Sequence, residues 1–583
     1  MLRIFKKCGK YWYLPLFLFL LILVQTVSDI GLPTVMGDVI KLIQGANGSQ
    51  PEYTDYLIWG CVLILAFAFL SALSAFLIGL CTSKLVSKIL TDVRQELYEH
   101  IDKFSMAEMN RFSTSSLLTR VTNDFTNINL TLNLGFRYVI YGPLVAIIAV
   151  VLMLTKNPAR PAWELILFFA GALAIILILV FLIVKFVLSK MNEIQKRTDH
   201  LTLVTRESLE GLRVIRAYNA EGYQEEKYGR INDGLSELQV FTNKMLAVFN
   251  PAVTFIGGAL SLVVAWIGST LIEQNAIEFS DITVYTQYCG LILVGIFMMI
   301  VVFVTMPKAM TSAKRIYEVI DTPISIVDSL SPETPKEIGT IEFKDVSFVY
   351  PGAEAPAIRH LSFKVERGQT LAFIGATGSG KSTVLNLLLR FFDASEGEVL
   401  VDGVNVKDYK LDDLFSRFRY VPQRGYLFHD TLRNNVCLGK TDASEEQVER
   451  ALSISESRDF VAKLPGTLDY EISQGGKNVS GGQRQRLCIA RAILMEPEIF
   501  VFDDSFSALD YRTDKILRTR IKEECVDVTN VIVAQRVGTI IDADQIIVLD
   551  EGNVVGHGTH EELLKNCPVY QEIASSQLGK EEK

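Results

Sequence analysis

The chain lacks the cysteine and histidine spacings that hold metals or redox centres. Its eight cysteines are scattered over 583 residues without a C-x-x-C pair, and its six histidines show no ligand spacing. Scattered thiols are typical of packed or lipid-facing side chains, so we expect neither a cysteine metal site nor a redox centre. No small-residue cleavage site follows the first apolar segment, which argues against a cleaved signal peptide.

The chain also lacks an excess of positive charge. Its net charge is −9, which argues against a general nucleic-acid-binding protein. What it has instead is a first half with long apolar runs and a second half with the composition of a soluble α/β protein. All four tryptophans lie in the first half.

Six apolar runs in the first half are long enough to cross a bilayer, which takes about 20 residues. A buried soluble core would not need so many runs of this length. We therefore predict an all-α membrane domain with six transmembrane helices over residues 1–320. The runs lie at about 13–40, 56–82, 137–155, 162–188, 247–272 and 282–306.

The distribution of basic residues orients these spans. Lys and Arg are absent from 45–55 and 273–281, whereas they are frequent at the N-terminus and in 83–136 and 189–246. The short loop at 156–160 is a mild exception. Because basic residues favour the cytoplasmic side, we expect both termini and both long connections in the cytoplasm.

The two long connections alternate apolar and charged residues at helical spacing, so we expect them to extend the membrane helices. About 25 residues each way would reach roughly 35 Å beyond the bilayer. Their turning points lie near 104–109 and 217–221. Each of these turns either contacts the second half of the chain or is a plain solvated turn, and the sequence leaves both open.

Two carboxylates, Asp29 and Asp38, lie on either side of Pro33 in the first apolar run. Intramembrane ionisable groups usually face a bundle interior or a cavity. A kinked helix with carboxylates facing the pathway and a helix that has already left the hydrocarbon are both compatible with this pattern. We assign no substrate role to either residue.

A linker at 321–338, rich in Pro, Ser and acidic residues, precedes a second domain at 339–583. Residues 375–383 (GATGSGKST) lie between an apolar strand pattern at 371–374 and a helical pattern from Val384. Glycines let such a turn present backbone N–H groups to a phosphate, and the helix N-terminus adds partial positive charge. Lys381 would reach the outer phosphates and Ser382 would hold Mg²⁺, so we predict a nucleotide site.

Two further stretches fit this site. Residues 499–504 (IFVFDD) form an apolar strand pattern ending in two carboxylates, which in a P-loop protein places an Asp near Mg²⁺. Residues 478–486 (NVSGGQRQR) precede a helix that we expect to begin near Leu487, and they offer a second phosphate-binding loop. Two such loops about 100 residues apart do not naturally share one nucleotide. They make sense when two domains enclose ATP between them.

The order of the motifs resembles the ATP-binding cassette (ABC) family. In order, the chain has Tyr350, the GATGSGKST loop, VPQ at 421–423, NVSGGQ at 478–483, FVFDD at 500–504 and SALD at 507–510. The six spans ahead of the cassette resemble the type IV exporter half-transporters. The resemblance covers nearly the whole chain, and it implies an α/β P-loop ABC nucleotide-binding domain fused to the membrane domain.

This resemblance implies roles for individual residues. Asp503, Ser382 and Gln423 would hold Mg²⁺, and Gln423 would also sense the γ-phosphate. Asp510 would cross the interface between two cassettes, although taken alone it also fits a helix cap. The implied nucleotide-binding residues are Tyr350 on adenine, the P-loop residues Gly375, Thr377, Gly378, Ser379, Gly380, Lys381, Ser382 and Thr383, and Ser480, Gly481, Gly482, Gln483 and Asp510 toward the nucleotide of a partner cassette.

Two catalytic positions depart from the family pattern. The family usually has Glu after the Mg²⁺-binding Asp, but this chain has Asp504, whose carboxylate is one methylene shorter. A misplacement of about 1 Å can slow a reaction about 100-fold. The family also has a switch His where this chain has Gln535, which is neutral and does not titrate. We therefore predict a cassette that binds ATP well and hydrolyses it poorly.

This combination resembles the degenerate-site subunit of heterodimeric multidrug exporters in the bacterial plasma membrane. The resemblance implies a second half-transporter that supplies a catalytic Glu and a switch His, and a substrate that is a drug, a lipid or another amphipathic compound. The alternatives are a homodimer with slow ATPase activity, an ATP-gated membrane regulator that does not transport, and an importer with an exporter-like fold.

Overall fold

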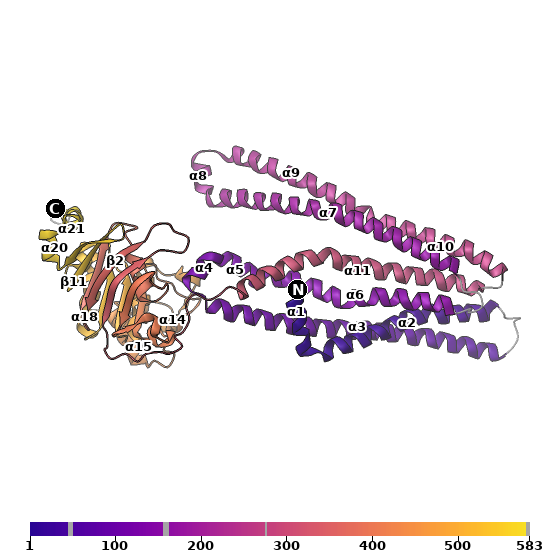
Figure 1. Ribbon diagram of the computed structural model, residues 1–583, viewed down its shortest axis with the longest axis horizontal. Helices are drawn as coiled ribbons and strands as arrows, with labels where there is room; N and C mark the ends of the chain where they lie inside the picture. The colour runs from indigo at the N-terminus through magenta and orange to yellow at the C-terminus, as the bar shows by residue number, and fades with distance from the viewer. Residues whose placement is uncertain (45–50, 156–162, 275–276, 579–583) are drawn as a thin grey trace. The chain divides into compact units, whose positions relative to one another are not determined.

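The structure is a computed structural model that describes residues 1–44, 51–155, 163–274 and 277–578. The chain divides into two compact units, Met1–Asp102 with Ser115–Thr322, and Lys103–Thr114 with Pro323–Lys583. The first unit is helical and the second is α/β, as the sequence predicts (Figure 1). The predicted loops at 45–55, 156–160 and 273–281 lie partly or wholly outside the described residues.

Each predicted span coincides, within two residues, with part of one long helix of the first unit. Over the described residues, five of these helices are long and apolar enough to cross a bilayer, namely α2, α3, α6, α10 and α11. The six helices are α2 (Tyr13–Gln44), α3 (Pro51–Asp102), α6 (Asn123–Thr155), α7 (Trp163–Glu210), α10 (Phe249–Glu273) and α11 (Phe279–Ile320).

The helices continue beyond the predicted spans, as expected from the helical pattern of the connections. α3 continues to Asp102 and α7 continues to Glu210. Pro33 lies inside α2, which remains one helix from Tyr13 to Gln44. The shorter elements of this unit are α1 (Leu2–Lys7), η1 (Cys8–Tyr11), α5 (Thr114–Val121), α8 (Leu212–Ala217) and α9 (Glu221–Ala247).

The membrane helices pack through apolar faces and one close glycine contact. α2 packs along α3, and α6 packs along α11 (Figure 1). A cluster of buried residues from α2, α6, α10 and α11 includes Ile30, Val145 and Tyr285. A Cβ on Gly142 of α6 would lie 2.9 Å from the carbonyl oxygen of Gly295 on α11. Such small residues let two membrane helices approach closely.

The first predicted turning point forms the short helix α4 (Met106–Phe112), which belongs to the second unit. Ser105 caps it, and the Glu108 carboxylate accepts hydrogen bonds from the backbone N–H groups of Ser105 at 2.8 Å and of Ser325 at 3.3 Å. Ala107 packs against one of the cores of this unit. The other turning point stays in the first unit, where Tyr218 is 80% exposed.

Two sheets organise the second unit. A four-stranded antiparallel sheet has the order β2-β1-β4-β5, and a six-stranded sheet has the order β12-β11-β3-β10-β9-β6, in which only β12 is antiparallel to its neighbour. A separate two-stranded sheet pairs β7 (Asp430–Thr431) with β8 (Glu471–Ile472). The strands of the two larger sheets are β1 (Ile341–Phe348), β2 (Ile358–Val365), β3 (Thr370–Gly375), β4 (Glu396–Val401), β5 (Val404–Asn405), β6 (Phe418–Val421), β9 (Ile499–Asp503), β10 (Thr529–Val533), β11 (Gln545–Asp550) and β12 (Asn553–Gly558).

Helices cover these sheets. Four of them are α12 (Lys381–Leu388), α13 (Leu411–Arg417), α17 (Gly481–Leu494) and α18 (Tyr511–Glu524). The others are η2 (Val406–Asp408), α14 (Leu432–Val436), α15 (Glu445–Ile454), α16 (Arg458–Val461), η3 (Thr467–Asp469), η4 (Gln474–Gly476), α19 (Val537–Ile540), α20 (His560–Asn566) and α21 (Pro568–Leu578).

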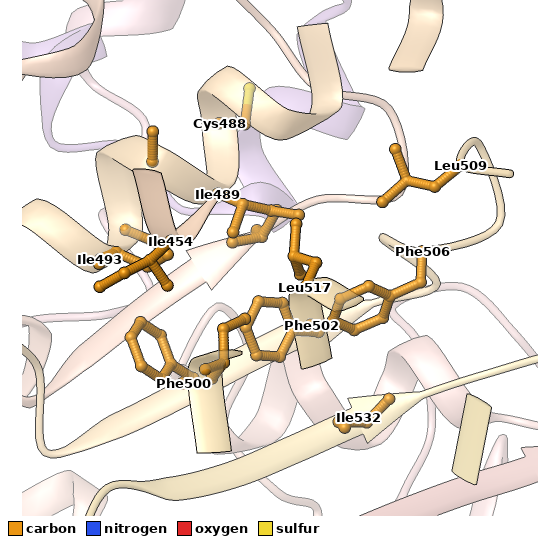
Figure 2. Close-up of a cluster of buried hydrophobic side chains, with 14 of the residues drawn as sticks. Ile454, Cys488, Ile489, Ile493, Phe500, Phe502, Phe506, Leu509, Leu517 and Ile532 are labelled. Carbon is orange, nitrogen blue, oxygen red and sulfur yellow. The ribbon is translucent and has the colours of Figure 1, made fainter. Parts of the chain in front are cut away.

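Strand β9 joins two hydrophobic cores because alternate side chains of a strand point to opposite faces. Phe500 and Phe502 enter the core beneath α17, together with Ile489 and Leu517 (Figure 2). Val501, on the opposite face, enters the core shared with the antiparallel sheet. All five residues of β9 are buried, so the position of its carboxyl end is fixed from both sides.

Candidate functional site

Four neighbouring parallel strands bring the predicted site residues to one edge of the sheet. Their order is β3-β10-β9-β6, and the chain leaves each at its carboxyl end. The P-loop follows β3, Gln535 follows β10, Asp503 ends β9, and Gln423 follows β6. Ligands of open α/β sheets bind outside the carboxyl ends of the strands. Residues more than 150 positions apart in the sequence therefore share one site.

The loop between β3 and α12 has the backbone that a phosphate-binding turn requires. Gly378 and Gly380 have φ values of +84° and +102°, a region that favours glycine. The Lys381 ammonium donates hydrogen bonds to the carbonyl oxygens of Gly375 at 3.0 Å and Ala376 at 2.7 Å. Burial lowers the pKa of Lys381. The ammonium is thus held inside the loop, where a phosphate would restore its lost solvation.

Asp503 lies at the end of β9 with two hydroxyl groups around its carboxylate. Ser382 Oγ donates to one carboxylate oxygen at 3.0 Å, and Tyr420 Oη donates to the other at 3.3 Å. Burial raises the pKa of Asp503, and the neighbouring Asp504 adds to this shift. A bound cation would favour the ionised carboxylate and reverse the direction of the shift.

Asp504 is held by the amides of two glutamines from neighbouring loops. Gln423 Nε2 donates to Asp504 Oδ2 at 3.0 Å, and Gln535 Nε2 donates to the same oxygen at 2.9 Å. Asp504 is only 7% exposed and has a φ of +47°. The two positions that depart from the family pattern, Asp504 and Gln535, are therefore direct hydrogen-bonding partners.

The predicted start of the helix after the NVSGGQ motif is wrong. α17 begins at Gly481 rather than near Leu487. Ser480 is its N-cap: Ser480 Oγ accepts from the Gln483 backbone N–H at 3.2 Å, and Gln483 Oε1 accepts from the Ser480 backbone N–H at 2.9 Å. This capping box stabilises a helix start that includes both glycines. Gln483 therefore shapes the loop with its side-chain oxygen.

Comparison with known proteins identifies this arrangement. Residues 16–297 match the model of the ABC transporter transmembrane region, and residues 358–507 match the ABC transporter model. An uncharacterized ABC transporter ATP-binding protein of Mycobacterium tuberculosis is 33% identical over 575 residues, which cover 97% of this chain and 96% of the relative. The chain belongs to the ABC transporter family.

Two further proteins refine the comparison within ABC transporters. The ATP-dependent lipid A-core flippase of Mannheimia succiniciproducens is 29% identical over 91% of this chain and 90% of its own. The solved structure of a bacterial Atm1-family ABC exporter with ATP bound superposes with a TM-score of 0.81 at 23% identity, over 96% of this chain and 97% of the other. The chain thus has the fold of an ABC exporter half-transporter, with one transmembrane and one ATP-binding domain.

The remaining predicted residues of this ABC domain lie around the P-loop or on helix ends. Tyr350 Oη lies 3.0 Å from Thr383 Oγ1 on α12, and its ring packs edge-on against Phe348 and Phe392. Asp510 caps α18 by accepting from the Thr513 backbone N–H at 3.0 Å, and this bond lowers the pKa of Asp510. Thr377 is exposed and Ser379 is buried.

Within the described residues, no hydrogen bond links the P-loop to the loop at 480–483. Ser480 and Gly481 are exposed at the N-terminus of α17. The first backbone N–H groups of a helix have no intrahelical partner and can bind an anion. This ABC domain therefore has two separate surfaces that suit phosphate.

Two residues that position the site, Tyr420 and Gln485, have no recognisable signal in the sequence. Tyr420 contacts Asp503 only because β6 is the neighbour of β9. Gln485 is 2% exposed, accepts from the Gly425 backbone N–H at 2.9 Å and donates to the Pro422 carbonyl at 2.9 Å. It therefore joins α17 to the loop that carries Gln423. Both contacts depend on tertiary structure.

The donor set also fits a magnesium ion. Mg²⁺ prefers hard oxygen ligands and usually takes one or two carboxylates together with phosphate oxygens and waters. Ser382 Oγ and Asp503 Oδ1 are already 3.0 Å apart beside the P-loop. The described residues contain no group of three or more His, Cys, Asp or Glu side chains that would enclose a metal on their own.

Proposed function

We propose that the chain is one subunit of a heterodimeric ATP-driven exporter of drugs, lipids or other amphipathic compounds. Its own P-loop site binds ATP and hydrolyses it poorly. The observation that carries this proposal is the contact of Asp504 with the neutral amides of Gln423 and Gln535. No titratable group stands at the switch position, and the carboxylate is one methylene shorter than a glutamate.

In this proposal, two composite sites have different tasks. The first contains the P-loop, Asp503, Asp504 and Gln535 of this chain, and it holds ATP between two cassettes. Mg²⁺ held by Ser382, Asp503 and Gln423 would neutralise charge on the phosphates. The second combines the partner's catalytic Glu and switch His with the loop at 480–483 of this chain. In the first site Tyr350 contacts adenine, and Asp510 faces the partner cassette.

The export direction and the substrate class are part of the same proposal. ATP would bind the closed pair of cassettes better than the open pair, and this difference in affinity would drive the change from inward to outward access. The lipid A-core flippase among the relatives supports an amphipathic substrate. The basic connections support a plasma-membrane protein with its ATP-binding domain and both termini in the cytoplasm.

The test uses inside-out vesicles that contain this chain and a half-transporter with a catalytic Glu and a switch His. We expect ATP-driven uptake of fluorescent lipid or lipophilic dye, and we expect nucleotide trapped at this chain's P-loop to be recovered as ATP. Coupled ATPase activity and uptake by the purified chain alone would favour a homodimer. ATP binding without uptake of any amphipathic probe would favour a membrane regulator.

Lys381→Ala should weaken ATP binding by this chain at least about tenfold, because hydrogen bonds to charged groups contribute about 1.5–3 kcal/mol. The side chain is buried inside the loop, where it donates to the carbonyl oxygens of Gly375 and Ala376. Titration with a fluorescent ATP analogue measures the change. Lys463→Ala is the control, because Lys463 is exposed on the same domain. Equal affinities of the two variants would contradict a phosphate contact by Lys381.

A further inference from the structure

A polar cluster lies where three membrane helices meet. Asp29 of α2 accepts a hydrogen bond from Tyr141 Oη of α6 at 2.6 Å and another from Ser71 Oγ of α3. Gln25 lies one turn before Asp29 on the same helix, so the two side chains share a face. α2, α3 and α6 run alongside one another within their unit (Figure 1). We call Gln25, Asp29, Ser71 and Tyr141 the Asp29 cluster.

The cluster has more acceptors than donors. A carboxylate offers about four acceptor sites, and only two neutral hydroxyl groups donate to Asp29 among the described residues. Gln25 is 8% exposed, and its buried Oε1 has no hydrogen-bond partner among the described residues. An unpaired buried polar group costs free energy, so a hydrogen-bond donor bound beside this oxygen would be stabilised.

A basic side chain on α6, Arg137, lies near the cluster. Arg137 lies one turn before Tyr141 on α6, and its guanidinium lies 5.1 Å from the centre of the Tyr138 ring. No ion pair joins it to Asp29 within the described residues. A carboxylate at the centre of a membrane helix is energetically costly. Such a residue is retained where it has a partner or a ligand.

We propose that Asp29 and Gln25 bind the primary ammonium group of an amphipathic compound that the transporter moves, a proposal that rests on the export function proposed above. The carboxylate supplies the opposite charge, and the Gln25 carbonyl accepts a second N–H. The surrounding apolar helices suit an alkyl or aromatic tail. A compound with neither N–H nor O–H donors would leave the Gln25 oxygen unpaired, and an anion would be repelled by Asp29.

The experiment measures binding of radiolabelled decylammonium to the full chain in lipid nanodiscs, with empty nanodiscs as the blank. Decyltrimethylammonium and decanol are compared, because the first keeps the charge without N–H donors and the second lacks the charge. Asp29→Asn should weaken decylammonium binding at least about tenfold, since a hydrogen bond to a charged group contributes about 1.5–3 kcal/mol. Decanol binding should not change.

Matched variants separate recognition from folding. Asp38→Asn removes an exposed carboxylate from the same helix and should leave decylammonium binding unchanged. Tyr141→Phe keeps the Asp29 charge and removes one neutral donor, so decylammonium binding should persist or become tighter. ATP-analogue binding by each variant reports an intact cassette. The proposal would be overturned if the wild type and Asp29→Asn preferred decylammonium over decanol to the same degree. It would also be overturned if the wild type bound decanol but not decylammonium.

Uptake into inside-out vesicles distinguishes the two proposals. If Asp29→Asn did not change the ATP-driven uptake of amphipathic probes, the export function would be supported and the ammonium site would be contradicted. Asp29-dependent binding of decylammonium without ATP-driven uptake of any probe would support the site and contradict export.

Discussion

The double substitution Asp504→Glu with Gln535→His should raise ATP hydrolysis at this chain's own site by up to about 100-fold, because a catalytic group misplaced by about 1 Å can cost that factor. In the structure, one oxygen of Asp504 accepts from Gln423 at 3.0 Å and from Gln535 at 2.9 Å. A glutamate would extend the carboxylate toward the phosphates. A histidine would replace a neutral amide with a group that titrates near neutral pH.

The measurement is phosphate release by the proposed heterodimer, assembled with a partner that carries Gln in place of its catalytic Glu, so that only this chain's site can respond. Asp504→Asn is the control, because it keeps the side-chain size and removes the charge. We expect Gln535→His alone to have little effect, since it leaves the carboxylate in place. An unchanged rate in the double variant would remove the support for a degenerate site.

The P-loop could be predicted from the sequence because its geometry is local. Glycines at 375, 378 and 380 all have positive φ values, and the apolar strand before them is buried on both faces. The start of α17 could also have been predicted. Ser480 and Gln483 have the S-x-x-Q spacing of a capping box, but the intervening glycines favoured a later helix start.

The contacts that decide the chemistry could not be predicted in this way. Tyr420 reaches Asp503 because of the strand order, and one sequence gives no direct signal for the order of parallel strands. Asp29 was visible as an intramembrane carboxylate, but its partners Ser71 and Tyr141 come from two other helices. The sequence identifies a carboxylate that is energetically costly inside a membrane, and only the fold shows which side chains surround it.

Arg417→Met should destabilise the ATP-binding domain by about 3–5 kcal/mol, because removing one partner of a buried ion pair leaves an uncompensated charge. Arg417 donates to Asp402 at 2.5 Å and to Glu498 at 2.7 Å, and Asp402 is 0% exposed. Glu498 directly precedes β9, the strand that ends in Asp503. The network therefore connects the turn between β4 and β5 to the strand that ends in Asp503.

The four tryptophans all lie in the membrane half, so intrinsic fluorescence would report the wrong domain. Hydrogen exchange of the β1 and β9 amides in the full chain measures the local opening free energy instead. Arg458→Met is the control, because its ion pair with Glu449 is largely exposed, and such pairs contribute about 0–1 kcal/mol. If Arg417→Met and Arg458→Met lowered the opening free energy by similar amounts, the buried ion pair of Arg417 would contribute no more than an exposed one.

The stability lost in Arg417→Met should depend on pH. Burial raises the pKa of Asp402 to about 6, so the folded domain binds a proton more tightly there than the unfolded chain does. Stability contributed by the protonated form is lost as pH rises through that value. Without Arg417 the ionised Asp402 carboxylate has no buried cation beside it, so the loss of stability should be larger at pH 8 than at pH 5.

Asp402→Asn removes the charge, and Asn tolerates the φ of +53° at this position. The double variant Asp402→Asn with Arg417→Met should therefore recover much of the lost stability and show no such pH dependence.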